Sequence, residues 1–254
     1  MAETELLPLK HGETGSNMRL YQRKTGSILF AAVITRPDIA FASSRLARFN
    51  TNPSDTHHEA ADQVIKYLYR TKGYSIQYGQ GKGTTASIGN MSQDLTCASD
   101  ASFADNTLDR KSSQGFIMTL FGGPIAWRAN KQDTVTTSST EAELLALSQT
   151  AKEAIFLSRM LKALIVKLDD PLSIQCDNRQ TLRLINEESA KLVTKLRHVD
   201  IHNHWLRQEV RCKRVGLTWV PTRDMMADGL TKSLGRQKHT LREYDRSNEY
   251  CGSN

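Results

Sequence analysis

The chain has 254 residues, of which 39% are hydrophobic, and this is enough to build the core of one or two domains. No apolar run approaches the roughly 20 residues of a membrane span, and the polar start MAETELLPLKHGETG lacks the apolar stretch of a secretory signal. We therefore expect a chain without membrane contact that is located inside the cell. The formal net charge of +7 favours an anionic partner such as nucleic acid.

The first part of the chain predicts a small helical unit over residues 20–80, after a flexible N-terminus at 1–19. Apolar residues recur at helical spacing through most of this unit. Pro37 and Pro53 interrupt the pattern, because proline disfavours a helix at the residue before it and fits a first helical turn. Three helices are therefore expected, and the glycine-rich segment 79–90 separates them from the rest.

After this segment the apolar residues alternate, which predicts strands. Three strands are expected to form an antiparallel meander: Leu95–Asp100, Gly115–Leu120 and Ile125–Arg128, with residues 121–124 as the last turn. The elements that follow are a helix over 141–167, a strand over 173–177, helices over 180–186 and 194–211, a strand over 215–220, and a helix that begins near Asp224. This order predicts an α/β domain over residues 91–234, with a five-stranded mixed sheet and helices on both faces. The polar residues 235–254 are expected to form a disordered tail.

Four acidic residues stand where these strands end or these helices begin: Asp100, Glu143, Asp177 and Asp228. In a layered α/β fold such positions converge on one edge of the sheet. Clustered carboxylates repel one another unless cations neutralise them, and oxygen-rich sites suit Mg²⁺ or Mn²⁺. Two such ions can promote phosphodiester hydrolysis. Taken alone, each Asp has a simpler interpretation as a turn former or as a partner of a helix N-terminus.

Glu143 has its own alternative, because Thr140-x-x-Glu143 matches a capping box in which the Glu only caps the helix. Against this, Glu143 shares a helical stripe with Leu147 and Ala151, so we expect it to point toward the sheet. By the same periodicity, Glu141 is expected to face outward.

The four cysteines are far apart in the sequence: Cys97, Cys176, Cys212 and Cys251. No C-x-x-C pair is present, so the spacing does not favour a structural zinc site. A disulfide framework is not typical of an intracellular chain of this size. We therefore expect ordinary buried or surface thiols.

Several long motifs carry a resemblance to a known family. They are TGSILFAAVITRPDIAFASSRLARF, IKYLYRTKG, CASDASFAD, DRKSSQGFIMTLFGGPIAW, SSTEAELLALSQTAKEAIFL, CDNRQTL, RHVDIHNHWLRQEV and VPTRDMMADGLTK. Over roughly residues 20–234 the chain resembles the Pol polyprotein of copia-type LTR retrotransposons, at the end of the reverse transcriptase and the RNase H domain after it. In this resemblance the helical unit 20–80 is a thumb or connection remnant.

Motif by motif, the resemblance marks Asp100, Glu143, Asp177 and Asp228 as catalytic ligands of two Mg²⁺ ions, with Mn²⁺ as an alternative. It implies endonucleolytic cleavage of the RNA strand of an RNA–DNA hybrid during reverse transcription, in a cytoplasmic virus-like particle or in the nucleus. No Y-x-D-D polymerase motif is present, so the polymerase domain would act in trans. The alternatives are a remnant that binds nucleic acid without cutting it, and a structural subunit.

Six polar residues are expected to contact the hybrid: Ser139, Asn178, Gln180, Arg197, His198 and His204. The first three flank the acids, where polar groups can recognise 2′-hydroxyls. The other three lie in a helix that the resemblance turns toward the substrate. Residues 191–214 carry seven Lys or Arg and two acids, which suits phosphate contacts, although a solvated helix face is the alternative. His198 and His204 are also candidate proton shuttles, because residues 220–227 contain no histidine.

Overall fold

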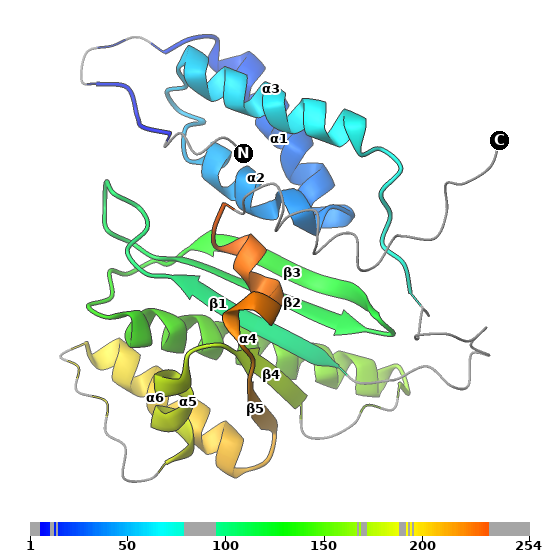
Figure 1. The fold of residues 1–254 in the computed structure, drawn as a ribbon, viewed down its shortest axis with the longest axis vertical. Coiled ribbons are helices and arrows are strands. Elements are labelled where there is room, and N and C mark those ends of the chain that lie inside the picture. Colours follow the sequence, from blue (N-terminus) through cyan, green and yellow to red (C-terminus); the bar gives the residue numbers. More distant parts are fainter. Residues whose placement is uncertain are drawn as a thin grey trace.

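A sheet lies between two helical layers in the computed structural model (Figure 1). The structure describes residues 6–10, 13, 15–78, 95–166, 168, 172–187, 192, 194 and 196–233. The expected tail at 235–254 and the glycine-rich segment 79–90 therefore lie outside the described residues, as do parts of the expected flexible N-terminus.

The sheet has five strands in the order β3-β2-β1-β4-β5. The strands are β1 (Thr96–Ser102), β2 (Ser113–Leu120), β3 (Gly123–Lys131), β4 (Leu172–Cys176) and β5 (Val215–Trp219). β2 is antiparallel to both β1 and β3, whereas β4 is parallel to both β1 and β5. The five-stranded mixed sheet of an α/β domain is thus confirmed.

One face of the sheet is covered by α4 (Ser139–Ala163), with α5 (Arg179–Asn186) and α6 (Arg197–Arg211) packed beside it. Strand side chains that point to this face, such as Cys97 and Met118, form the main core with Leu144 and Leu147 of α4. Leu206 ties α6 into the same core. Because these residues are fully buried and apolar, they contribute most of the burial that holds the layers together.

The opposite face is covered by α2 (Ala40–Ala47) and η4 (Met226–Leu230). Ala98 and Ile117 alternate with the residues of the main core and meet Ala40 and Leu230 on this face. The indole N–H of Trp127 donates a 2.7 Å hydrogen bond to the carbonyl of Ala32 at the end of α1. Helices on both faces of the sheet are thus confirmed.

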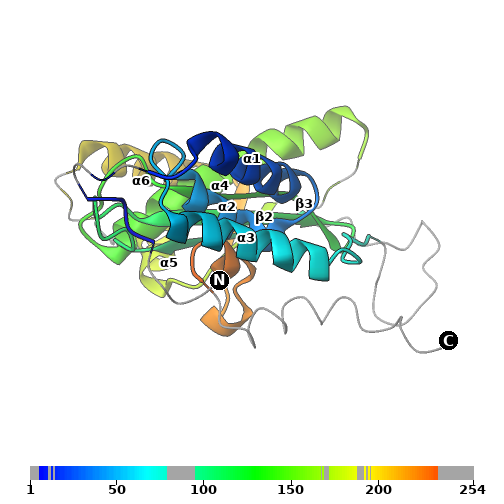
Figure 2. The ribbon, with the colours of Figure 1, turned by 90° about the horizontal axis from the view of Figure 1, so that it is seen from above.

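The N-terminal helices form a unit with its own core, in which Tyr21, Ile28 and Leu46 are fully buried. Its elements are α1 (Met18–Ile34), η1 (Pro37–Ile39), α2 and α3 (Asp55–Arg70), so the three expected helices are joined by a short 3₁₀ helix that was not predicted. Seen from above, α1 and α3 lie over the strands (Figure 2). Of the described helices, none combines the length and the apolar character that a bilayer crossing requires.

The turn between β2 and β3 is tighter than the sequence predicted. Leu120 pairs with Gly123, so Phe121 and Gly122 alone make the turn, with φ angles of 53° and 77°. These positive φ angles match the twist that a tight hairpin needs. Gly123 is the first residue of β3, and a Cβ on it would lie 2.4 Å from the carbonyl oxygen of Gln77. Because glycine has no side chain, the segment that follows α3 can pack against β3 at this position.

The end of the domain also differs from the predicted helix near Asp224. Two short 3₁₀ helices, η3 (Thr222–Asp224) and η4, replace it, because Met225 between them has an extended backbone with φ −70° and ψ 106°. η4 lies directly on β2 at Gly115, where a Cβ would come within 2.6 Å of Leu230 Cβ. Gly115 pairs with Asp100 across β1 and β2, so this close approach brings η4 against the strand that carries Asp100.

We predict that Gly115→Ala destabilises the protein by about 1–3 kcal/mol, the usual cost of forcing extra volume into a packed site. The added methyl group must displace η4 from β2. The measurement is urea unfolding followed by circular dichroism, and Gly26→Ala is the matched control, because a Cβ at Gly26 meets nothing within 4 Å. Equal unfolding free energies for Gly115→Ala and the unsubstituted protein would show that η4 does not pack as described.

Candidate active site

Four separate elements bring the four predicted acids to one end of the sheet, and we call these residues the acid cluster. They are Asp100 in β1, Glu143 in α4, Asp177 directly after β4, and Asp228 in η4. In the parallel pairing of β1 and β4, Ala98 lies beside Gln175. Asp100 and Asp177 each follow this pair by two residues, so the two acids lie at the same end of the two strands. The backbone pairing ends at Ala98 and Gln175. Side chains from both faces of the sheet can therefore meet beyond this point.

Glu143 and Asp177 form one half of the acid cluster, on the side of α4. One ligand atom each from Glu143, Cys176 and Asp177 lies within 4.8 Å of the other two. Glu143 is 6% exposed, whereas Asp177 is half-buried. The hydroxyl of Thr222 donates a 2.8 Å hydrogen bond to Asp177 Oδ2 and so fixes one oxygen of this carboxylate.

Asp100 and Asp228 form the other half, on the side of η4. Lys232 Nζ lies 2.8 Å from Asp228 Oδ1 and 3.5 Å from Asp100 Oδ2, so one ammonium group joins both carboxylates. The hydroxyl of Thr231 donates a hydrogen bond to Asp100 Oδ2. Both acids are almost fully buried. The group of three ligand atoms within 4.8 Å does not include these two acids.

The burial of these carboxylates changes their acidity. Burial raises the pKa of Asp100 to about 6, against the opposing effects of Lys232 and Thr231. Burial, and then the charges of Asp100 and Asp177, raise the pKa of Glu143 well above its ordinary value. Asp100 Oδ1 and Glu143 Oε2 are buried and have no hydrogen-bond partner among the described residues. A divalent cation would supply the missing partner and offset the repulsion, so the donor set fits Mg²⁺ or Mn²⁺.

The expectation that Glu141 faces outward is wrong. Glu141 is 2% exposed, and its Oε2 accepts hydrogen bonds from the backbone N–H and the hydroxyl of Thr137, at 2.7 and 2.8 Å. α4 begins earlier than predicted, and Ser138 is its N-cap, accepting a hydrogen bond from the Glu141 N–H. The capping role considered for Glu143 therefore belongs to Glu141, and Glu143 lies on the buried stripe.

Three of the predicted substrate contacts lie at the starts of α4 and α5, beside the acid cluster. Asn178 accepts hydrogen bonds from the N–H groups of Gln180 and Thr181, at 3.0 and 3.1 Å, and so caps α5. The hydroxyl of Thr140 donates a 3.3 Å hydrogen bond to Gln180 Oε1, which joins the two helix starts. Ser139 and Gln180 are exposed. Their contact with a substrate stays a prediction.

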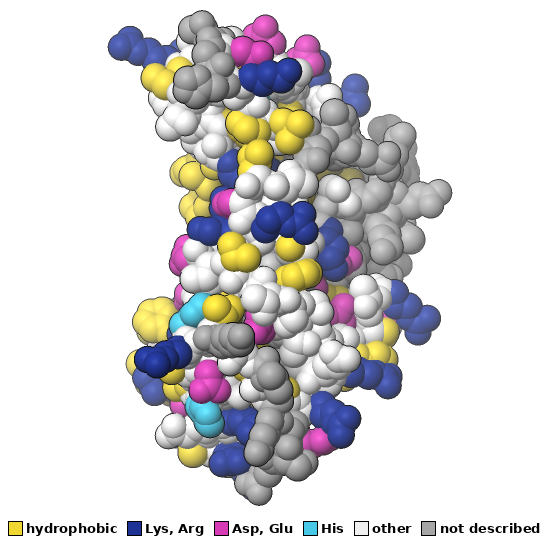
Figure 3. Space-filling view, turned by 90° about the vertical axis from the view of Figure 1, so that its left-hand side faces the viewer, with side chains coloured by type: hydrophobic (Ala, Val, Ile, Leu, Met, Phe, Trp, Pro, Cys, Tyr) yellow, Lys and Arg dark blue, Asp and Glu magenta, His cyan; other side chains and the backbone are white. Residues whose placement is uncertain are grey.

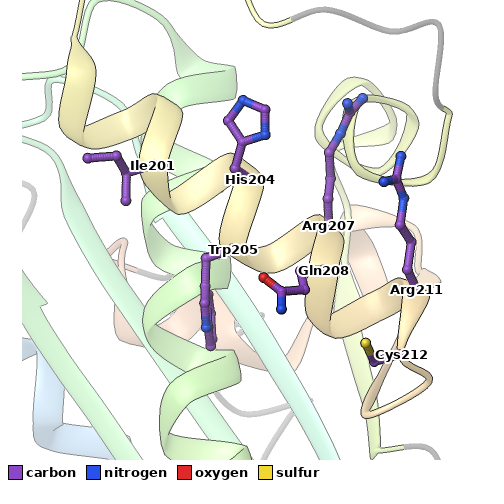
Figure 4. A pocket seen from close by; sticks show the side chains of 7 residues that line it. All are labelled: Ile201, His204, Trp205, Arg207, Gln208, Arg211 and Cys212. Carbon is purple, nitrogen blue, oxygen red and sulfur yellow. The ribbon is translucent and has the colours of Figure 1, made fainter.

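The other three, Arg197, His198 and His204, lie on α6. His198 Nε2 is 3.2 Å from Thr134 Oγ1, and His204 Nε2 is 3.6 Å from Asp200 Oδ1. His204 also lines a hollow of about 700 Å³, to which no member of the acid cluster contributes. In Figure 4 Trp205 points from α6 toward α4, while His204 points away from it. The substrate and proton-shuttle roles of these residues stay predictions.

Some of the positive charge in residues 191–214 serves the fold itself. Arg207 donates hydrogen bonds to the carbonyls of Leu184 and Glu187 at the end of α5, at 2.9 and 2.7 Å. Arg214 forms an ion pair with Glu209 at 2.5 Å. On the face that Figure 3 shows, Lys and Arg are spread widely with acidic side chains between them. The excess positive charge is therefore not gathered into one patch on that face.

Sequence reasoning missed the residues that hold the acids in place. Lys232 follows Asp228 by four residues, a spacing that brings side chains together on one turn, and this was the available signal. Thr222 and Thr231 gave no such signal, because their contacts depend on the fold. The ring of Trp219 stacks under the Arg179 guanidinium, with 4.0 Å between Cζ and the ring centroid, and Trp219 Nε1 donates to the Asp177 carbonyl.

Comparison with known proteins finds similar polyproteins and similar solved structures, while no family model matches the chain. The chain is 33% identical over 242 residues to the retrovirus-related Pol polyprotein from transposon TNT 1-94 of Nicotiana tabacum, covering 93% of this chain and 17% of the polyprotein. It is also 33% identical over 236 residues to the retrovirus-related Pol polyprotein from transposon RE2 of Arabidopsis thaliana. This match covers 93% of this chain and 15% of that polyprotein. An N-terminal RNase H domain from Mycobacterium tuberculosis, solved as a fusion with maltose-binding protein, matches with a TM-score of 0.41 and 13% identity over 61% of this chain and 100% of that chain.

The two relatives are much longer than this chain, which spans 17% and 15% of their lengths. The matched part nevertheless includes almost the whole of this chain, the N-terminal helices as well as the sheet domain. The chain belongs to the retrovirus-related Pol polyproteins of copia-type transposons.

Proposed function

We propose that the sheet domain hydrolyses the RNA strand of an RNA–DNA hybrid endonucleolytically, with two Mg²⁺ ions, during retrotransposon reverse transcription inside the cell. One observation carries the proposal: Asp100 Oδ1 and Glu143 Oε2 are buried without a hydrogen-bond partner among the described residues, beside two further carboxylates. Burying unpaired carboxylates costs free energy, so their collection at one place suits a site that is completed by cations. Membership of the Pol family supports the same reaction.

In this proposal Asp100, Glu143, Asp177 and Asp228 would hold the ions, whose positive charge would supply acidification of a water molecule and stabilisation of the leaving oxygen. Thr231 donates a hydrogen bond to one oxygen of Asp100, and Thr222 donates one to an oxygen of Asp177. These hydrogen bonds orient the two carboxylates. Lys232 offsets part of the negative charge on the side of η4. The expected products carry a 5′-phosphate and a 3′-hydroxyl.

The substrate is proposed to lie across the starts of α4 and α5. Ser139, Asn178 and Gln180 are the proposed contacts to the 2′-hydroxyls of the RNA strand, and Arg197, His198 and His204 of α6 are the proposed contacts to its backbone. The stacked pair of Arg179 and Trp219 adds an exposed cation beside Asp177, where a phosphate of the hybrid can be bound.

The helical unit at 20–80 is proposed to be a thumb or connection segment, and a polymerase domain is its proposed partner. α1 supports a protein partner, because Leu29, Phe30, Val33 and Ile34 are each at least half exposed. Exposed apolar side chains that adjoin on one helix are typical of interaction surfaces.

A second candidate function is nucleic-acid binding without cleavage. It is favoured by Lys232, which already forms ion pairs with Asp100 and Asp228 and could make this half of the acid cluster a purely structural feature. The two candidates differ in their need for divalent cations and for an ionised Asp177.

We predict that the full chain cuts the RNA of a labelled RNA–DNA hybrid only when Mg²⁺ or Mn²⁺ is added. Asp177→Asn and Glu143→Gln should each lower the cleavage rate by at least about 100-fold, because residues that merely orient metal ligands cost about 10–100-fold when replaced. The measurement is the rate of product formation on a denaturing gel.

Asp224→Asn is the matched control for this assay, because Asp224 is an exposed acid four residues before Asp228 and pairs only with Arg223 among its described ion pairs. It should cleave at the unsubstituted rate. Hybrid binding in a gel shift without cleavage would favour the second candidate, and cleavage by Asp177→Asn at the control rate would contradict the metal site.

The acid cluster also predicts how stability depends on pH when no divalent cation is present. Asp100 has a pKa of about 6 in the folded protein, above its ordinary 3.8, so its favourable contribution is present below pH 3.8 and is lost as the pH rises through about 6. Asp100→Asn removes this loss. As the pH rises from about 4 to about 6, the substituted protein should gain stability relative to the unsubstituted one, up to an amount on the order of 3 kcal/mol that persists at higher pH.

Thermal melting in EDTA and in excess Mg²⁺ measures this effect. Mg²⁺ should stabilise the unsubstituted protein more at about pH 8 than at about pH 5, because protons compete for the same oxygens. The stabilisation by Mg²⁺ should be much smaller in Asp100→Asn, whereas Asp224→Asn should behave as the unsubstituted protein. A difference between Asp100→Asn and the unsubstituted protein that does not change with pH would contradict the assigned charge state.

A further inference from the structure

Cys176 places a thiol inside the acid cluster. It is the last residue of β4, its side chain is fully buried on the side of α4, and it adjoins Asp177 in sequence. Its Sγ, one oxygen of Glu143 and one oxygen of Asp177 all lie within 4.8 Å of one another. A sulfur ligand therefore adjoins two of the carboxylates proposed to hold Mg²⁺.

The burial of Glu143 is a second observation that points to a ligand between Glu143, Cys176 and Asp177. Glu143 is 6% exposed, and its Oε2 is buried and has no hydrogen-bond partner among the described residues. The nearest described contact of Cys176 Sγ is weak, a 3.9 Å approach to the carbonyl of Asn178. Glu143 Oε2 and the Cys176 thiol thus have no strong hydrogen bond that a cation would have to break, and the hydrogen bond that the Glu143 carboxylate accepts from the backbone N–H of Ala101 can remain.

We propose that Glu143, Cys176 and Asp177 form a binding site for a thiophilic divalent cation, Zn²⁺ or Cd²⁺, which occupies two of the carboxylates proposed to hold Mg²⁺. Three protein ligands with an open fourth position are typical of zinc sites that keep a water molecule. Mg²⁺ requires oxygen ligands and octahedral geometry, so the sulfur favours the softer ions over Mg²⁺. The two kinds of cation then compete, and the thiophilic ion inhibits Mg²⁺-dependent cleavage.

The protonation of the thiol is compatible with such a site. In the metal-free protein Cys176 is a neutral thiol, because burial and the nearby Glu143 and Asp177 charges hold its pKa well above its ordinary value. Binding forms a metal–sulfur bond and releases the thiol proton to water. The half-exposed Asp177 offers the cation a way in from solvent.

The test is a Cd²⁺ titration of the metal-free full chain, followed by the ultraviolet charge-transfer absorption of a cadmium–thiolate bond. The reference protein carries Cys212→Ser and Cys251→Ser, because Cys212 is an exposed thiol that is open to Cd²⁺ and Cys251 is a further thiol in the sequence. The reference should show a saturable band. Adding Cys176→Ser, with folding checked by circular dichroism, should abolish it.

A band that persists in the Cys176→Ser protein, or no band in the reference, overturns the site. If Cys176→Ser fails to fold, Glu143→Gln in the reference decides, because it keeps the thiol and removes one ligand charge. Its affinity for Cd²⁺ should fall by at least about tenfold, equivalent to about 1.4 kcal/mol, and an unchanged affinity overturns the site.

This readout does not depend on cleavage, so the site and the proposed nuclease function can fail separately. In a protein that cleaves, Cys176→Ser should raise the Cd²⁺ concentration for half-inhibition by at least about tenfold relative to the reference. Equal half-inhibition concentrations would show that Cd²⁺ inhibits at some place other than Cys176.

Discussion

Electrostatic repulsion among Asp100, Glu143, Asp177 and Asp228 is the constraint on which the rest of the structure depends. These carboxylates are held at one end of the sheet, and three of them are almost fully buried. Repulsion and burial both disfavour ionised carboxylates, and the raised pKa values of Asp100 and Glu143 express this cost. The ammonium group of Lys232 offsets part of it. The remaining negative charge makes the site suitable for divalent cations.

The fold imposes this arrangement through packing that has no chemical role of its own. The parallel pairing of β1 and β4 leads both chains to the end of the sheet where Asp100 and Asp177 lie, and α4 buries Glu143 on the same stripe as Leu147. Gly115 lets η4 approach the sheet, which brings Asp228 to the other side of the same gap. Well-packed apolar layers on both faces thus supply the free energy that keeps like charges together.

The sequence predicted the sheet and its strand directions, because alternating apolar residues are local signals, and it placed four acids at element ends that meet at one end of the sheet, while their role as metal ligands stays a prediction. It failed where a side chain is placed by contacts between distant residues. Glu141 was expected to face outward, but Thr137 turns it inward and Ser138 begins the helix earlier than expected. Lys232 could have been found from its spacing to Asp228, whereas the approach of the Cys176 thiol to Glu143 required the packing of α4 on β4.

A crystal soaked in Mn²⁺ tests the central claim most directly, because the anomalous scattering of manganese locates each ion without reference to activity. The account predicts anomalous peaks within coordination distance of Asp100, Glu143 and Asp177, with Lys232 Nζ displaced from Asp100. Crystals that show no peak at these carboxylates, with the ion pairs of Lys232 intact, would contradict it.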